Sequence, residues 1–217
     1  MPLRLYLLRN AETDYCLTGR YCSRDRVNLT ERGQQMADYF AKTYHQLPWN
    51  AIFCSPLHHA IETIRPLCQA TNLDFECRDG LRELSFGKWE GMSPAEVNVM
   101  FHDNYIRWLA DPAWNNPTQG EKGIQVARRS SDVLAEIEEA YPDGNVLIVS
   151  HKATLRIMLC TLLGVDVGRY RDRLAMTVTA VSLVELMEYG PFVRQFNDCS
   201  HLPPHLRRPW AGNGSDG

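Results

Sequence analysis

Apolar residues recur along the chain in two alternating patterns. Short apolar runs predict buried strands, and stretches with apolar residues three or four positions apart predict helices. The predicted strands cover residues 3–8, 50–54, 74–78, 145–150, 178–187 and 192–196, of which the last two form a terminal pair. Strands that alternate with helices predict an α/β fold, a three-layer α/β/α sandwich around a mainly parallel sheet. The nearly all-apolar strand 145–150 is expected at the centre of this sheet.

Capping residues mark where several of the predicted helices begin. Thr30 is placed to cap a helix that follows it, although Gly33 is an unfavourable residue for a first turn. Ser55 and Pro56 predict a second start, with serine as the cap and proline at the first helical position. Ser93 and the Glu three residues later form a capping box. Two further helices are predicted over residues 124–141 and 151–163.

Two segments do not fit the alternation of strands and helices. Residues 101–120 contain Tyr105, Trp108 and Trp114 together with two prolines, and they predict an irregular, partly helical excursion whose aromatic residues pack and cover the binding pocket. Residues 203–217 combine adjacent prolines with a glycine-rich end and predict a flexible C-terminal tail. The expected organisation is therefore one domain over residues 1–202, followed by this tail.

Composition and charge exclude several classes of protein. The 217 residues are 44% hydrophobic and 23% charged, the balance of a soluble globular protein. With 23 basic and 26 acidic residues, the net charge of −3 excludes a bulk basic surface for nucleic acid. No apolar run reaches the roughly 18 residues of a membrane helix, and the first residues lack the apolar core of a signal peptide. We therefore expect a cytoplasmic protein with no nucleic-acid or membrane partner, whereas the oligomeric state stays open.

The seven cysteines are odd in number and irregularly spaced, without a Cys-x-x-Cys pair. In a chain of this length, such a pattern indicates reduced thiols rather than a disulfide framework. No Cys and His residues occur at the spacing of a zinc site, and His58 and His59 are adjacent, so that on a helix they point about 100° apart. We expect no bound metal and no cofactor.

Polar residues gather directly after three of the predicted strands. These clusters are Arg9–Thr13, Ser55–Ala60 and Ser150–Thr154. Ligands of open α/β sheets bind beyond the carboxyl ends of the strands, so we expect the three clusters to meet in one site. Together they supply a permanent cation, several imidazoles and two helix N-termini, a combination that suits a phosphate group.

The same clusters carry an ordered series of motifs. They are Leu7–Thr13, Leu29–Gly33, Cys54–Thr63, Glu83 with Gly87–Gly91, and Val149–His151. In this order and over residues 3–196, the chain resembles the histidine phosphatase superfamily, which is also called the phosphoglycerate mutase-like family. The resemblance implies an α/β domain that acts on small phosphorylated metabolites through a covalent phosphohistidine, without a metal.

The resemblance also implies roles for individual residues. Arg9 matches the family's first phosphate-binding arginine, whose planar fork suits phosphate oxygens. His151 matches the second histidine of the site, and Glu83 matches the acid that protonates the leaving oxygen. Trp89 is expected to pack in the core rather than to stack on a ligand, and Thr30 and Thr63 are expected to cap or pack.

Two positions depart from the family pattern. Asn10 stands where the nucleophilic histidine is expected, and an amide nitrogen has no available lone pair with which to accept a phosphoryl group. His59 stands where the second phosphate-binding arginine is expected, and an imidazole is mostly uncharged at neutral pH. Asn10 can still donate a hydrogen bond to phosphate, and Lys152 is a candidate to replace part of the lost positive charge.

Several interpretations remain open from the residues alone. The favoured one is a domain that binds a small phosphate ester through Arg9, Asn10, His59 and His151, with phosphoryl transfer lost or strongly weakened. A second is an active phosphomonoesterase or phosphoglycerate mutase-type enzyme, in which another imidazole or water takes over, or a nucleophile-substituted form of such an enzyme. A third is an interaction scaffold without a ligand, for which phosphate esters would leave the thermal stability unchanged.

Overall fold

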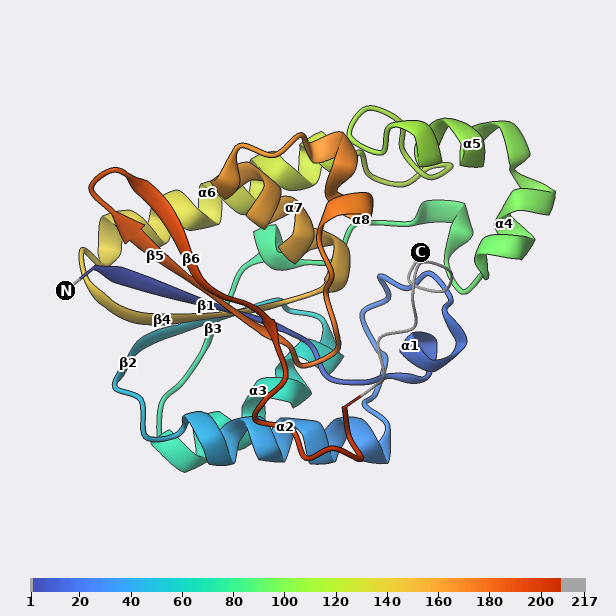
Figure 1. The fold of residues 1–217 in the computed structure, drawn as a ribbon. Helices are drawn as coiled ribbons and strands as arrows, with labels where there is room; N and C mark the ends of the chain where they lie inside the picture. The colour runs from blue at the N-terminus through green and yellow to red at the C-terminus, as the bar shows by residue number, and fades with distance from the viewer. Residues whose placement is uncertain (1, 208–217) are drawn as a thin grey trace.

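A six-stranded sheet forms the centre of the computed structural model, which describes residues 2–207 (Figure 1). Its strand order is β3-β2-β4-β1-β5-β6. The strands are β1 (Leu3–Arg9), β2 (Trp49–Cys54), β3 (Glu76–Cys77), β4 (Gly144–Ser150), β5 (Val181–Met187) and β6 (Gly190–Asp198). Strands β3, β2, β4 and β1 are parallel, whereas β5 is antiparallel to β1 and β6 is antiparallel to β5. The predicted fold class is confirmed, including the central position of β4 and the terminal strand pair.

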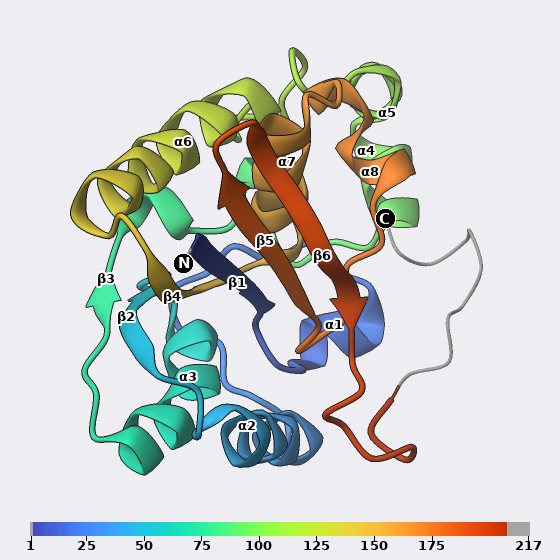
Figure 2. The ribbon, with the colours of Figure 1, turned by 60° about the vertical axis from the view of Figure 1, so that its left-hand side comes forward.

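Helices cover both faces of this sheet. They are α1 (Asp14–Thr18), α2 (Glu31–Tyr44), α3 (His58–Thr71), α4 (Pro94–Met100), α5 (His102–Ala110), α6 (Gly123–Ala140), α7 (Lys152–Leu163) and α8 (Tyr170–Arg173). Helices α2 and α3 lie on one face, and α6 and α7 lie on the other (Figures 1 and 2). Side chains of a strand alternate between its two faces. Accordingly, Leu5 and Leu7 of β1 pack in the core under α6 and α7, and Tyr6 and Leu8 pack in the core under α2 and α3.

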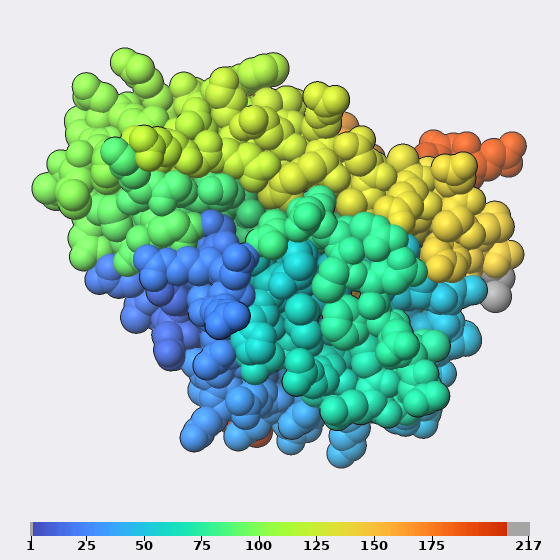
Figure 3. All heavy atoms as spheres, turned by 180° about the vertical axis from the view of Figure 1, so that it is seen from behind, coloured from blue at the N-terminus to red at the C-terminus, as the bar shows by residue number. Residues whose placement is uncertain are grey.

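The excursion after residue 101 packs beside the sheet rather than over it. Helices α4, α5 and α8 gather at the end of the sheet toward which β1 runs (Figure 1), and α4, α5 and α6 form a continuous band of surface, coloured green to yellow in Figure 3. Trp89 and Trp108 are buried in the apolar cluster of this region, in an edge-to-face contact with ring centroids 5.3 Å apart. Trp89 therefore packs as predicted, whereas Trp114 is 63% exposed.

The start of α3 differs from the prediction. The helix begins at His58 after an N-cap at Leu57 that makes no side-chain capping bond, so Ser55 and Pro56 lie outside it. The backbone N–H of Ser55 donates to Val149 O at 2.9 Å and so continues the pairing of β2 with β4. The Ser55 hydroxyl contacts His151 Nε2 and accepts the N–H of Leu57, which lies before the helix, so it caps no N–H group inside α3. Strand β3 is likewise shorter than predicted and contains only Glu76 and Cys77.

Other helix ends agree with the sequence. Thr30 Oγ1 accepts a bond from the Gly33 N–H at 3.0 Å, and Ser93 forms the expected capping box with Glu96. The structure also explains the glycine in the first turn of α2. A Cβ atom at Gly33 would lie 2.2 Å from the carbonyl oxygen of Glu12, so the segment after β1 can approach α2 only because that atom is missing.

The C-terminal boundary stays a prediction, because residues 208–217 lie outside the described part of the chain. The first residues of the predicted tail pack on the domain: Leu206 is only 1% exposed, and Arg207 donates to the carbonyl oxygen of Leu202 at 2.7 Å. None of the helices within residues 2–207 combines the length and apolar character that a membrane-spanning helix requires.

Candidate active site

The three polar clusters meet at one edge of the sheet. Strands β1, β2 and β4 are parallel neighbours, and their carboxyl ends are tied together because Asn10 N–H donates to Ser150 O at 2.9 Å. A cavity of about 490 Å³ opens at this edge. Its lining includes all six side chains that the sequence singled out, namely Arg9, Asn10, His59, Glu83, His151 and Lys152.

Arg9 is the last residue of β1 and turns its guanidinium group into the cavity wall. Its Nη1 donates to the carbonyl oxygen of Met176, and its Nη2 lies 3.8 Å from Cys16 Sγ. Within residues 2–207, Arg9 has no carboxylate partner, and its buried Nε has no hydrogen-bond acceptor. The positive charge of Arg9 is thus positioned by neutral groups and is not cancelled by a neighbouring acid.

Asn10 lies directly after Arg9 and is 5% exposed. Its Nδ2 donates to the carbonyl oxygen of Ala11 at 2.8 Å, and its Oδ1 lies 3.2 Å from His151 Nδ1. One N–H of the amide is therefore committed to the backbone, and the amide oxygen is directed at the second imidazole of the site.

His59 and His151 form a buried imidazole pair. Their rings meet edge to face with centroids 4.8 Å apart, and His59 Nε2 lies 3.1 Å from His151 Nδ1. Burial, with smaller effects of the His58 and Arg9 charges, lowers the pKa of His59 to about 4. Burial and the adjacent His59 also hold the pKa of His151 well below its ordinary value. Both imidazoles are therefore neutral at pH 7.

Glu83 is held at the N-terminus of α7. Its Oε1 accepts bonds from the N–H groups of Leu84 and Thr154 at 2.8 and 3.1 Å and from the Thr154 hydroxyl at 3.2 Å. Its Oε2 accepts the Ala153 N–H at 3.1 Å. A carboxylate is favoured at this end of a helix by the exposed N–H groups and the helix dipole. These contacts fix Glu83 in the cavity wall, in the position where the sequence predicts an acid.

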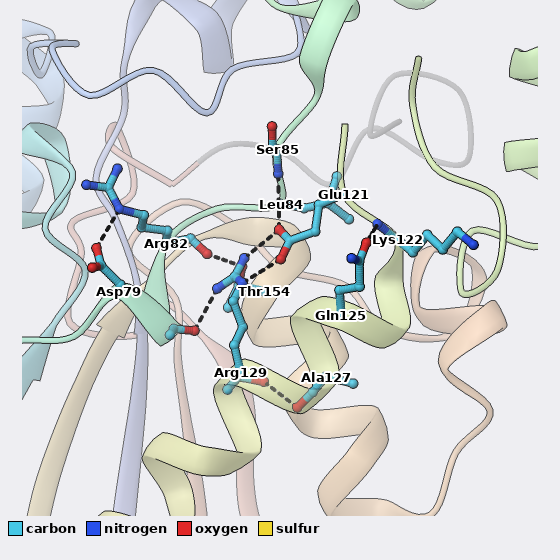
Figure 4. A network of polar contacts seen from close by, with 12 residues as sticks. Asp79, Arg82, Leu84, Ser85, Glu121, Lys122, Gln125, Ala127, Arg129 and Thr154 are labelled. Atoms are coloured by element: carbon cyan, nitrogen blue, oxygen red, sulfur yellow. Dashed lines mark hydrogen bonds and ion pairs between the residues drawn. The ribbon is translucent and has the colours of Figure 1, made fainter. Parts of the chain in front are cut away.

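A second layer of polar contacts supports the loop that carries Glu83 (Figure 4). Arg129 of α6 forms a two-bond fork with Glu121, with N···O distances of 2.8 and 3.0 Å. The same guanidinium group donates to the carbonyl oxygen of Gly80 at 2.6 Å, and the Thr154 hydroxyl donates to the carbonyl oxygen of Arg82 at 2.7 Å. The loop is therefore tied to both α6 and α7.

The remaining residues of the motifs have structural positions. Thr63 is fully buried, accepts the Ala11 N–H at 2.9 Å and donates to His59 O at 2.6 Å, so that it packs as expected. His58 points away from His59, and its Nε2 lies 3.4 Å from a carboxylate oxygen of Glu62. Within the part of the chain that the structure describes, no three or more His, Cys, Asp or Glu side chains are grouped to hold a metal ion.

Some residues of the site have contacts or positions that the sequence did not indicate. Ser55 belongs to one of the three predicted clusters, but its individual role was expected to be a helix cap, whereas its hydroxyl lies 2.6 Å from His151 Nε2. Cys16 adjoins Arg9, and residues 176–178, Cys199 and Arg207 also line the cavity. Nothing in the local sequence places these last residues near β1.

Comparisons with known proteins agree with this arrangement. A family profile described as histidine phosphatase superfamily (branch 1) matches residues 5–199. Phosphoserine phosphatase 1 of Hydrogenobacter thermophilus is 28% identical over 200 residues, which cover 92% of this chain and 94% of the relative. Adenosylcobalamin/alpha-ribazole phosphatase of Escherichia coli is 28% identical over 162 residues, 75% of this chain and 80% of the relative. The structure of the alpha-ribazole phosphatase from Shigella flexneri superposes with a TM-score of 0.82 at 25% identity, covering 90% of this chain and 96% of that one.

Proposed function

The chain belongs to the histidine phosphatase superfamily, and we propose that its cavity binds a small phosphate monoester while phosphohistidine-mediated transfer is lost or strongly weakened. In this proposal Arg9 and the imidazoles of His59 and His151 hold the phosphate, and Asn10 donates its second N–H to it. Glu83 lines the part of the cavity that would contain the leaving group. The names of the relatives, a phosphoserine phosphatase and an alpha-ribazole phosphatase, support a phosphorylated metabolite as the ligand.

Two buried N–H groups without an acceptor carry the proposal. Within residues 2–207, neither Arg9 Nε nor His59 Nδ1 has a hydrogen-bond partner, and both side chains line the same cavity. An unsatisfied buried polar group costs about 1–3 kcal/mol, so such groups are normally paired in the functional state of a protein. The oxygens of a phosphate group are the acceptors that this cavity lacks, and the uncompensated charge of Arg9 favours an anion over a neutral ligand.

The weakened chemistry follows from Asn10 and His59. Phosphoryl transfer requires a nucleophile with a lone pair to attack the phosphorus atom, and the amide nitrogen of Asn10 has no available lone pair. The transferred group also spreads negative charge over three oxygens, which fixed cations stabilise. His59 is neutral at pH 7 and supplies no such charge. Lys152, which begins α7 at the cavity wall, is the proposed partial replacement.

The second candidate is an active phosphomonoesterase, which the names of the relatives favour. The remaining groups of a site can still bind and polarise a substrate after the nucleophile is removed. In such an enzyme, water or one of the neutral imidazoles would attack the phosphorus atom. The two candidates differ in turnover and agree on binding.

Hydrolysis assays of the parent protein and Asn10→His distinguish these candidates. Histidine at position 10 can donate its Nδ1–H to Ala11 O, as the Asn10 amide does, and so direct Nε2 with its lone pair into the cavity. We expect no turnover of p-nitrophenyl phosphate, phosphoserine or sugar phosphates by the parent, and measurable turnover by Asn10→His. Adding Arg9→Ala to Asn10→His should remove that turnover.

Two outcomes would contradict the proposal. Turnover by the parent that depends on Arg9 would establish the active phosphomonoesterase. If no phosphate ester raised the thermal unfolding temperature of the parent, the cavity would not be a phosphate site, because a ligand that binds only the folded state must stabilise it.

A further inference from the structure

A fully buried hydroxyl contacts the second imidazole of the site. Ser55 is 0% exposed, and its Oγ lies 2.6 Å from Nε2 of His151, a short distance for this type of bond. The other ring nitrogen of His151, Nδ1, faces Asn10 Oδ1 at 3.2 Å and His59 Nε2 at 3.1 Å. The two nitrogens of this imidazole therefore have different partners, and those partners determine where its proton resides.

The hydrogen-bond pattern assigns each proton. Asn10 Nδ2 donates to Ala11 O, so the amide presents its oxygen, which can only accept, to His151 Nδ1. His151 Nδ1 must then carry the proton, and Nε2 must hold the lone pair. The hydroxyl of Ser55 already accepts the N–H of Leu57 at 3.3 Å, and its own proton is available for His151 Nε2. Every contact of the ring is satisfied in this arrangement.

We propose that Ser55 is a positioning residue whose hydroxyl, together with the Asn10 amide oxygen, holds His151 in the Nδ1–H form, so that this imidazole offers a proton donor, not a lone pair, to the cavity. The role of this donor toward the cavity rests on the proposed function, since it concerns the bound phosphate. The assignment of the proton to Nδ1 is independent of the proposed function, because it follows from the contacts among Ser55, His151 and Asn10.

The fixed proton on His151 also determines the state of His59. Because His151 Nδ1–H points at His59 Nε2, that nitrogen must hold a lone pair, and the proton of neutral His59 must be on Nδ1. His59 Nδ1 is the buried atom without a partner in the cavity wall. A second proton on His59 would oppose two N–H groups across 3.1 Å. Burial and the nearby Arg9 charge, which lower the pKa of His59, disfavour it as well.

These proton positions determine what the two imidazoles offer to a bound anion. Both act as neutral hydrogen-bond donors, and the positive charge in their immediate surroundings comes from arginines. Loss of the Ser55 hydroxyl removes the hydrogen-bond partner of His151 Nε2, which would leave the ring less firmly held and its Nδ1–H donor less well directed at the anion. The loss of one hydrogen bond to a charged group corresponds to a roughly tenfold or greater loss of affinity.

Nitrogen NMR of the imidazole rings tests the assignment directly. Long-range ¹H–¹⁵N spectra of the ¹⁵N-labelled full-length chain at pH 7.5 distinguish protonated from unprotonated ring nitrogens, with His59→Gln and His151→Gln to assign the signals. We expect His151 and His59 of the parent both to be protonated at Nδ1. Protonation of His151 at Nε2 in the parent would overturn the proposal, and this result needs no variant of Ser55.

Ser55→Ala and Ser150→Ala form a matched pair of variants. Ser150 is also fully buried and precedes His151 in the chain, but its hydroxyl donates to Leu81 O at 2.7 Å and does not contact the ring. Both variants remove a fully buried, hydrogen-bonded hydroxyl, so a general structural effect should appear in both. We expect the Nε2 resonance of His151 to shift in Ser55→Ala alone, because only that variant removes the hydrogen bond to this nitrogen, and an unchanged spectrum in that variant would refute the role of Ser55.

Calorimetric titration with inorganic phosphate adds the functional measurement. We expect Ser55→Ala to bind phosphate about tenfold more weakly than Ser150→Ala. Equal affinities would refute the link between the imidazole proton and the anion. If the parent bound no phosphate while its histidines showed the predicted protons, the proposed function would fail and the role of Ser55 in placing the proton would stand.

Discussion

Acidification should destabilise this protein through His59. In the folded chain, burial and the neighbouring positive charges lower the pKa of this residue to about 4, whereas an unfolded chain has an ordinary histidine pKa of about 6.5. Between these two values the unfolded chain binds a proton at His59 that the folded chain does not. The free energy of unfolding is therefore highest above pH 6.5 and falls as the pH decreases toward 4.

The size of the effect follows from the depth of burial. His59 is 5% exposed, so solvent screens its surroundings little. For each pH unit over which the unfolded chain binds one proton more than the folded chain, the free energy of unfolding changes by about 1.4 kcal/mol. Lowering the pH from 6.5 to 5 therefore reduces the free energy of unfolding by about 2 kcal/mol. His201 is buried against Phe40 and Tyr44 with a pKa of about 4, so it adds a second contribution of the same sign.

Urea unfolding followed by tryptophan fluorescence between pH 5 and pH 7.5 measures this effect. The parent should lose about 2 kcal/mol more than His59→Gln over that range, because the variant has no histidine at position 59 in either state. His102→Gln is the control, since His102 is exposed and its Nδ1 lies 2.9 Å from Asn98 Oδ1 in α4. If the parent and His59→Gln lost equal stability between pH 7.5 and pH 5, the reasoning from burial would be refuted.

Three further substitutions test other parts of the structure. Gly33→Ala should lower the free energy of unfolding by on the order of 2 kcal/mol, measured by urea titration, because the new methyl group would collide with the Glu12 carbonyl. Arg129→Met should accelerate amide hydrogen exchange in the loop that carries the predicted acid, whereas Arg128→Met on the exposed side of α6 should leave it unchanged. Arg9→Lys should weaken phosphate binding about tenfold by calorimetry, since an ammonium group cannot reproduce the planar fork of the guanidinium.

Local sequence was sufficient where one segment determines the outcome. The apolar run in β1 predicts a buried strand, because side chains on both faces of such a strand must be covered. Thr30 predicts the start of α2 because its hydroxyl bonds the N–H of Gly33, only three residues away. Arg9, Asn10 and His151 could be placed together in advance, since all three follow strands of one parallel sheet and the carboxyl ends of such strands share an edge.

Ser55 shows where that reasoning ends. A serine before a proline has two possible partners for its hydroxyl, a helix N–H nearby or a group elsewhere in the fold, and the sequence pattern indicated the nearer one. In the structure the Ser55 hydroxyl accepts the N–H of Leu57, which lies outside the helix, and also pairs with His151, which is 96 residues away along the chain. That pairing exists because β4 lies beside β2, an adjacency that depends on the packing of the whole sheet and that neither segment specifies alone.

The fold class, the strand ends that carry the chemistry and the replacement of the expected nucleophile by Asn10 could all be predicted from residue order. The protonation and hydrogen bonding of the site depend on how the whole chain packs. The low pKa values of His59 and His151 arise from burial, and the wall formed by Met176 and Arg207 comes from chain that follows the last parallel strand. Burial and long-range hydrogen bonds are properties of the packed molecule, since each requires groups that are distant in sequence to exclude water together.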